Sequence, residues 1–316
     1  MKKILIIGAN GQIGSELIAA LRGKYGAGNV VGFDLREPKE EQKKAGPFEV
    51  GDASKKEVLA AALDRHSIDT VFHLVALLSA TGEKDPDLCW TLNMGSLKNV
   101  LDLAREKKLQ VFWPSSIAAF GPATPKVKTP QETVMAPTTM YGVTKVAGEL
   151  MCQYYKLKWG VDVRSVRYPG LISWKTPPGG GTTDYAVAIF YEALQKGSYE
   201  CFVGQKTILP MMYMPDAIRG IMELMEAPKE KIKVNTSYNL AAISFSAQEL
   251  ADVVKKKVPG FSCSFKPDAR QKIADSWPQS IDDSAARADW GWKHEYGLEK
   301  MADDMLENLK KKFGKK

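Results

Sequence analysis

The sequence has few of the residues that build metal centres and disulfide frameworks. Its 316 residues include four cysteines, none in Cys-x-x-Cys spacing: Cys89, Cys152, Cys201 and Cys263. Its three histidines, His66, His73 and His294, lie far in sequence from any cysteine or second histidine at zinc-ligand spacing. We therefore expect buried thiols in a reducing compartment and no metal site.

Long apolar runs are also missing. No stretch approaches the roughly 20 apolar residues of a membrane-spanning helix. The N-terminal MKKILIIGANG begins as a strand, whereas a signal peptide needs a longer apolar core and a cleavage site. These absences favour the cytosol.

Excess charge is concentrated at one end. The net charge is +7, but five of the last seven residues, KKKFGKK, are lysines. We predict a frayed tail there, which argues against a basic groove for nucleic acid.

What the sequence does have is an alternation of short apolar runs and amphipathic stretches. The apolar runs predict strands at about 2–8, 29–34, 69–74, 109–114 and 161–168. The amphipathic stretches predict helices at about 11–24, 54–66, 85–107 and 139–159. This order is typical of a doubly wound parallel α/β sheet of the Rossmann type.

A second region is expected after Pro169. The Pro/Gly-rich SWKTPPGGGTTDY, 173–185, predicts a substrate lid or a domain crossing. Further helices are expected at about 183–196, 214–227, 246–257 and 296–312. We assign 1–169, with about 206–240 returning to it, to a dinucleotide-binding domain, and 170–205 and 241–316 to a smaller substrate-binding region.

A glycine pattern opens the chain. ILIIGANGQIGSEL places Gly8, Gly11 and Gly14 directly after a strand and before a helix. Glycines at these positions allow a tight turn, a backbone approach to a pyrophosphate, and close packing of helix on strand. The pattern predicts a dinucleotide site.

Acidic residues at the next strand ends indicate which dinucleotide binds. Asp34 lies 20 residues after Gly14, where a carboxylate can accept hydrogen bonds from the adenosine ribose. Arg36 could attract a 2′-phosphate, but the carboxylate at the strand end favours NAD over NADP. Asp52 could bind the adenine amine or serve as an N-cap for the following helix.

A tyrosine and a lysine share one helical face in MYGVTKVAGE. Tyr141 and Lys145 are four residues apart and therefore project side by side. At about 5 Å and an effective dielectric near 20, the ammonium favours the phenolate by about 3 kcal/mol, or about two pKa units. The phenol is then a plausible base near neutral pH. Upstream, Ser115 and Ser116 end a predicted strand, where one hydroxyl could hold a substrate oxygen.

These motifs together resemble the extended short-chain dehydrogenase/reductase family. GANGQIG, HLVA, PSSIAAFG and YGVTK carry the resemblance over about 170 residues, and similar features continue to MPDAIRG. Ile7 and Phe120 depart from the frequent threonine and tyrosine, but neither departure removes a catalytic hydroxyl. The resemblance implies the catalytic set Ser116, Tyr141 and Lys145.

The resemblance also implies the other contacts. RYPG, 167–170, would pass near the nicotinamide, and helices 85–107 and 139–159 would form a homodimeric four-helix bundle. The implied coenzyme-binding residues are Gly8, Asn10, Gly11, Gln12, Ile13, Gly14, Asp34, Arg36, Asp52, Leu74, Ala76, Tyr141, Lys145 and Tyr168. His73 is expected to pack or bond at a strand end, since tyrosine already supplies the base.

The sequence of the second region reduces the number of substrate classes to consider. Nucleotide-sugar epimerases usually carry an Arg-Asp pair where this chain has Leu209 and Pro210 in LPMMYMPDAIRG. The segments beginning SWKTPPGGG and DSWPQS resemble the short-chain family of NAD-dependent L-threonine 3-dehydrogenases, and that resemblance covers nearly the whole chain. It implies metal-independent oxidation of L-threonine. A nucleotide-sugar 4-epimerase or dehydratase, or a non-catalytic NAD(H)-binding regulator, is the alternative.

Substrate contacts follow from the same resemblance. Besides Ser116 and Tyr141, they are Ser79, Thr182, Thr183 and Trp277. Each has a structural alternative: a loop turn for Ser79, helix capping for Thr183, and plain packing for Trp277.

Overall fold

The computed structural model describes residues 1–314 and divides into two compact units. The first comprises Met1–Ser115, Thr139–Val166 and Ile218–Tyr238. The second comprises Ser116–Thr138, Arg167–Ala217 and the chain from Asn239 onward. Of the residues that the sequence assigned to the first region, 116–138, 167–169, 206–217 and 239–240 group with the second.

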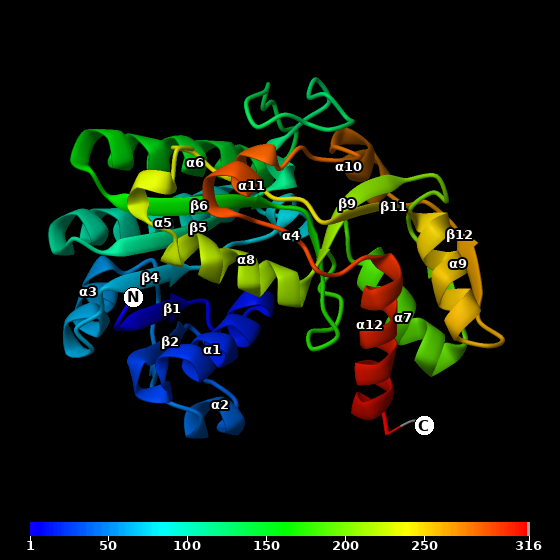
Figure 1. Cartoon of the computed structure of the whole chain (residues 1–316), viewed down its shortest axis with the longest axis horizontal. Helices are drawn as coiled ribbons and strands as arrows, with labels where there is room; N and C mark the ends of the chain where they lie inside the picture. Colours follow the sequence, from blue (N-terminus) through cyan, green and yellow to red (C-terminus); the bar gives the residue numbers. More distant parts are fainter. Residues whose placement is uncertain (315–316) are drawn as a thin grey trace. The chain divides into compact units, whose positions relative to one another are not determined.

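A seven-stranded sheet forms the centre of the fold, with strand order β10-β6-β5-β4-β1-β2-β3 (Figure 1). Its strands are β1 (Ile4–Ile7), β2 (Val30–Asp34), β3 (Phe48–Val50), β4 (Thr70–His73), β5 (Gln110–Ser116), β6 (Asp162–Tyr168) and β10 (Tyr238–Asn239). β1 pairs in parallel with both β2 and β4, so the chain winds outward in two directions from this point. The predicted doubly wound α/β class and its five strands are confirmed.

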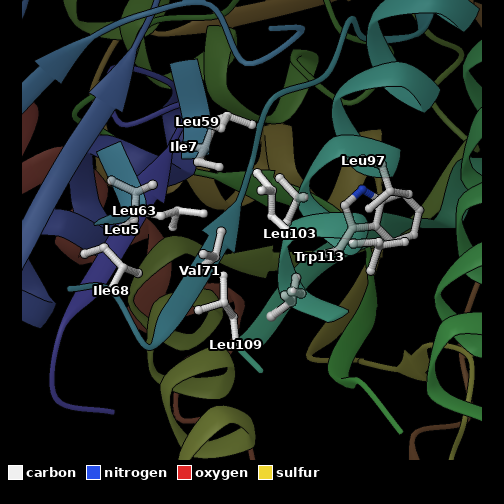
Figure 2. Close-up of a cluster of buried hydrophobic side chains, with 14 of the residues drawn as sticks. Leu5, Ile7, Leu59, Leu63, Ile68, Val71, Leu97, Leu103, Leu109 and Trp113 are labelled. Atoms are coloured by element: carbon white, nitrogen blue, oxygen red, sulfur yellow. The ribbon is translucent and has the colours of Figure 1, made fainter. Parts of the chain in front are cut away.

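Burial explains why these short runs form strands. Every residue of β1, β2 and β4 is buried, as expected for a parallel sheet covered on both faces. Leu5, Val71 and Trp113 point into one apolar cluster with Leu63 and Leu97 of the helices on that face (Figure 2). The opposite face is covered by the first helix.

That first helix contacts the sheet through a glycine. A Cβ on Gly32 of β2 would lie 2.9 Å from Ile18 Cδ1. Alternating residues of a strand point to opposite faces, so Gly32 faces away from the cluster that contains Val31 and Phe33. The sheet of the first unit is thus enclosed between two helical layers.

The helices of this unit follow the predicted ranges, with two short additions. They are α1 (Gln12–Tyr25), α2 (Glu40–Lys44), α3 (Lys56–Arg65), α4 (Ser79–Gly82), α5 (Pro86–Lys107), α6 (Met140–Trp159) and, from Ile218, α8 (Met214–Glu226). Short 3₁₀ turns occur at η1 (Ala27–Asn29) and η3 (Lys229–Lys231). α6 begins where the Thr139 hydroxyl accepts from Gly142 N at 3.1 Å and ends at left-handed Gly160. These caps are local sequence signals.

The second unit holds two small sheets and a helical layer. Its strands are β7 (Gly170–Ile172), β8 (Ser198–Cys201), β9 (Ile208–Tyr213), β11 (Ile243–Ser246) and β12 (Ser262–Phe265). Its helices are η2 (Ile117–Ala119), α7 (Tyr185–Lys196), α9 (Ala247–Lys257), α10 (Arg270–Ser276), α11 (Ser284–Trp290) and α12 (Leu298–Lys312). α7, α9 and α12 pack together (Figure 1). β9 is the middle strand of the sheet β11-β9-β7.

Several expectations need adjustment. The predicted frayed tail is wrong for Lys310, Lys311 and Lys312, which belong to α12; Lys315 and Lys316 lie outside the described residues. Three cysteines are buried as free thiols, but Cys263 is partly exposed.

Within residues 1–314, no helix is long and apolar enough to cross a membrane, and no group of three or more potential ligands could hold a metal ion.

Candidate functional site

A cavity of about 240 Å³ opens at the carboxyl ends of the first four strands. Its lining comes from the loops after β1, β2, β3 and β4 and from α5: Ile7, Gly8, Gly11, Phe33, Asp34, Leu35, Arg36, Gly51, Asp52, Ala53, Leu74, Val75, Ala76 and Leu92. Ligands of doubly wound sheets bind at this edge, where the strand order reverses. Seven of the predicted coenzyme residues line this one cavity.

The glycine loop is shaped by close backbone contacts. Gly8 has φ 88°, and a Cβ there would lie 3.2 Å from the Leu74 carbonyl carbon. A Cβ on Gly14 would lie 2.2 Å from the Gly8 carbonyl oxygen. Gly11 begins α1 without a side-chain cap, so the first N–H groups of the helix, from Gln12 and Ile13, are available to an anion.

Asp34 ties this loop to the end of β2. Its carboxylate is buried and accepts from Asn10 N at 2.9 Å and from Arg36 N at 3.0 Å. The Asn10 side chain also donates to the Arg36 carbonyl at 2.8 Å. The Arg36 guanidinium is largely exposed and its Nε lies 3.5 Å from Asp34 Oδ1. The arrangement gives a fixed carboxylate suited to a ribose diol.

Asp52 is placed at the cavity and does not cap the helix. Its Oδ1 accepts from Ser54 N at 2.8 Å, and this hydrogen bond holds the pKa of Asp52 below its usual range. The N-cap of α3 is Lys55, which makes no side-chain cap bond. The capping alternative is therefore wrong. The apolar lining from Leu35 and Leu92 was missed, because single leucines carry no signal of their own.

Tyr141 and Lys145 lie on the buried face of α6. Lys145 Nζ donates to the Pro114 carbonyl at 2.6 Å and lies 5.3 Å from the centre of the Tyr141 ring. It also lies 4.6 Å from the centre of the Trp113 ring. Burial lowers the pKa of Lys145 to about 8, against opposing charge interactions. Below that pH an ammonium stands beside the phenol, as the helical spacing predicts.

The two serines at the end of β5 differ in environment. Ser115 is buried and its hydroxyl donates to Glu149 Oε1 at 2.5 Å. Ser116 is less buried, ends the strand, and accepts from Ala118 N at 3.2 Å. The position at a strand end left the pair open and the family resemblance selected Ser116; in the structure the Ser115 hydroxyl is engaged by Glu149, a carboxylate that sequence reasoning missed.

Ser79 follows a segment that is held by buried polar side chains of α5. Ser79 is buried and begins α4, so it is not a loop-turn residue. Asn93, also missed, accepts from Leu77 N at 2.8 Å and donates to Thr144 Oγ1 at 3.1 Å. His73 forms a hydrogen bond with Ser96 of α5, as expected, and burial lowers the pKa of His73 to about 3.

Two predicted substrate residues of the second unit, Thr182 and Thr183, lie just before α7. Thr182 is buried, and its hydroxyl has no hydrogen-bond partner among residues 1–314. Asp184, rather than Thr183, is the N-cap, so the capping alternative for Thr183 is wrong. One oxygen of Asp184 accepts from three successive backbone N–H groups of the glycine-rich loop, Gly179–Gly181, at 2.6 to 2.8 Å.

Other predicted positions are engaged elsewhere. Trp277 is buried and lines a separate cavity of about 340 Å³ with Lys126 and Gln271. The Tyr168 hydroxyl donates to the Ala217 carbonyl at 2.7 Å. Leu209 and Pro210 are buried in β9, so that strand offers no charged pair at these positions to a diphosphate.

Comparison with known proteins adds an independent finding. The profile of the family described as "NAD dependent epimerase/dehydratase family" matches residues 4–241. An uncharacterized epimerase/dehydratase of Staphylococcus haemolyticus is 51% identical over 314 residues, 99% of each chain. A solved GalE-like L-threonine dehydrogenase from Cupriavidus necator, in holo form, is 57% identical with TM-score 0.95, covering 97% of this chain and 99% of its own. A solved L-threonine 3-dehydrogenase from a metagenome, described as monomeric, is 48% identical with TM-score 0.94, covering 98% and 99%.

Proposed function

Because the chain belongs to the NAD dependent epimerase/dehydratase family, we propose that it is an NAD-dependent L-threonine 3-dehydrogenase of threonine catabolism. It oxidises the Cβ hydroxyl of L-threonine to give 2-amino-3-oxobutanoate and NADH. One observation carries the proposal: similarity to an L-threonine dehydrogenase extends through both units at 57% identity. The buried Leu209 and Pro210 argue in the same direction, against a nucleotide diphosphate.

The cavity at β1–β4 suits NAD. The close approach of Gly8 to the loop after β4 and the uncapped start of α1 fit a pyrophosphate. The fixed Asp34 carboxylate fits an unphosphorylated ribose and would repel a 2′-phosphate. The chemistry that NAD supplies when bound is acceptance of a hydride.

The chain's own residues manage the proton and the substrate. Tyr141 takes the proton of the threonine hydroxyl, and the Lys145 ammonium lowers the energy of the resulting phenolate. The Ser116 hydroxyl donates a hydrogen bond to the same substrate oxygen and so positions it beside Tyr141. No metal ligand takes part in these steps.

Binding of the amino-acid end falls to other residues. We assign the carboxylate to Thr182 and Thr183, whose position beside the start of α7 supplies donors; the unused buried hydroxyl of Thr182 supports this. Ser79 contacts the polar end of the substrate, and we leave Trp277 out of the substrate site because its buried side chain lines the separate cavity with Lys126 and Gln271. We also place the enzyme in the cytoplasm, where its four free thiols are stable.

NADH absorbance tests the reaction. Purified protein mixed with NAD, L-threonine and a chelator should produce NADH. Turnover of a UDP-sugar without threonine oxidation would identify the epimerase alternative, and NAD binding without turnover of either would identify a regulator. Tyr141→Phe should lose about 100- to 10,000-fold in kcat, because its base is gone. Its affinity for NAD should stay near that of the wild type, and retained turnover would exclude Tyr141 as the base.

We further propose a homodimer through a four-helix bundle of α5 and α6. Apolar side chains on α6 recur at helical spacing and remain exposed: Val143, Leu150, Tyr154 and Leu157. Such a stripe is typical of a face that pairs with a second copy. Sedimentation of the wild type should give a dimer, and Leu157→Glu, at a position 67% exposed, should dissociate it.

The matched control is Val127→Glu, at a position 64% exposed in the second unit. This variant should remain dimeric. A wild-type chain that sediments as a monomer would overturn the dimer and would match the relative described as monomeric.

A further inference from the structure

One buried acidic residue has no part in the reaction as described above. Glu149 lies in α6 with 0% of its surface exposed. It stands four residues after Lys145 and eight after Tyr141, so the three side chains share one helical face. A carboxylate is almost never fully buried unless it is paired. Its partners therefore indicate what it does.

The carboxylate and the lysine attach α6 to consecutive residues of β5. The Ser115 hydroxyl donates to Glu149 at 2.5 Å, and Lys145 donates to the Pro114 carbonyl at 2.6 Å. Helix and strand approach closely here, since a Cβ on Gly148 would lie 2.4 Å from the Trp113 ring. The two hydrogen bonds fix both side chains at the contact.

Glu149 supplies a carboxylate near Lys145, whose other titratable neighbours include the Tyr141 phenol, with its ring centre 5.3 Å from Lys145 Nζ. α6 also presents Cys152, α5 presents Cys89 and β4 presents His73. Burial raises the pKa of both thiols above their usual range, and burial lowers that of His73 to about 3, so all three are neutral near pH 7. Glu83, in the turn after α4, accepts from Met140 N at the first residue of α6 at 2.7 Å.

We propose that Glu149 is a positioning residue, which keeps the Lys145 amine charged and, through Ser115, holds the end of β5 against α6. The proposal rests on the proposed function in one respect: the charged amine serves the reaction through Tyr141. Glu149 itself contacts neither substrate nor coenzyme in this scheme. It compensates for the burial that would otherwise discharge the amine.

The experiment compares removal of the charge with removal of the hydrogen bond. Glu149→Gln keeps size and an acceptor for Ser115 but removes the charge, whereas Ser115→Ala keeps the charge and removes the donor. Lys145 is titrated by NMR of protein labelled with ¹³C at lysine Cε, without coenzyme, and Lys145→Met identifies its signal. Glu149→Gln should lower the titration midpoint by about one to two pH units, which is the effect expected at an effective dielectric near 20 for two charges about 6 to 10 Å apart on one helical face.

Ser115→Ala should leave the midpoint unchanged. An unchanged midpoint in Glu149→Gln would overturn the proposal, and so would an equal fall in both variants. If the Glu149→Gln variant does not fold, the test uses Glu149→Asp, which keeps a carboxylate. Lys145 of that variant must titrate near its wild-type midpoint, and a fall of the midpoint by one pH unit or more would overturn the proposal.

Steady-state rates supply the second readout. The Glu149→Gln variant should lose threonine oxidation most strongly above the lowered titration midpoint of Lys145, so its pH–rate profile should shift to lower pH. A purely structural defect would instead lower the rate equally at every pH. If the wild type does not oxidise threonine, the proposed function fails while the NMR titration still decides the role of Glu149.

Discussion

Replacing Lys145 by methionine tests the electrostatic basis of the proposed reaction. Methionine keeps an unbranched side chain in the buried site and removes only the amine. Lys145 Nζ lies 5.3 Å from the centre of the Tyr141 ring, and both side chains are buried. At an effective dielectric near 20, that separation corresponds to about 3 kcal/mol of phenolate stabilisation. The phenol of the variant should therefore ionise about two pKa units higher, leaving about 100-fold less phenolate at neutral pH.

The pH dependence of this loss has a definite sign. The pKa of Lys145 is lowered to about 8 by burial, so the wild type has its ammonium below that pH and loses it as the pH rises. The ratio of wild-type to variant kcat/KM should be about 100 near pH 7 and should shrink steadily above pH 8. NADH formation measured from pH 6 to 10 gives the ratio directly.

A pH-independent ratio would refute this reasoning. It would mean that Lys145 acts by binding the coenzyme rather than by tuning the phenol. The affinity of each protein for NAD, measured by quenching of tryptophan fluorescence, separates the two roles, because a tuning role leaves that affinity nearly unchanged.

Two glycine substitutions test the packing of the site, each with a control on its own or a neighbouring helix. Gly14→Ala places a Cβ 2.2 Å from a carbonyl oxygen of the coenzyme loop and should abolish NAD binding measured by calorimetry. The control Gly23→Ala, whose Cβ would meet no described atom within 4 Å, should bind NAD normally. Equal NAD affinities of the two variants would refute the role given to the close contact at Gly14. Gly148→Ala meets the Trp113 ring at 2.4 Å and should lower the free energy of unfolding by about 1–3 kcal/mol. Gly95→Ala, also with open space, should raise it by up to about 1 kcal/mol, and a stabilised Gly148→Ala would contradict the close helix–strand contact.

The elements that the sequence predicts well depend on local signals. α6 illustrates this, because Thr139 caps its start and Gly160 ends it. The coenzyme loop is equally local, since a strand, three glycines and a helix follow one another directly. Helices of four to seven residues such as α4 and α10 were missed, because they are too short for a helical period to show.

Contacts between distant segments could not be read in the same way. The Ser115–Glu149 hydrogen bond joins residues 34 apart, and the Asn93–Thr144 bond joins residues 51 apart. In neither pair does a sequence motif around one residue specify the other residue as its hydrogen-bond partner. The capping alternative for Thr183 failed for a related reason: Asp184 is the N-cap of α7, and only the folded path of the loop shows that three N–H groups converge on the Asp184 carboxylate.

The hydrogen bonds that join Asn10, Asp34 and Arg36 have a consequence for the kinetics of coenzyme binding. Since the two loops are already joined by their own backbone and side-chain contacts, little conformational entropy remains to be lost when a dinucleotide arrives. Association on this side should therefore proceed as a single bimolecular step, without the slow isomerisation that ordering of a loop would add.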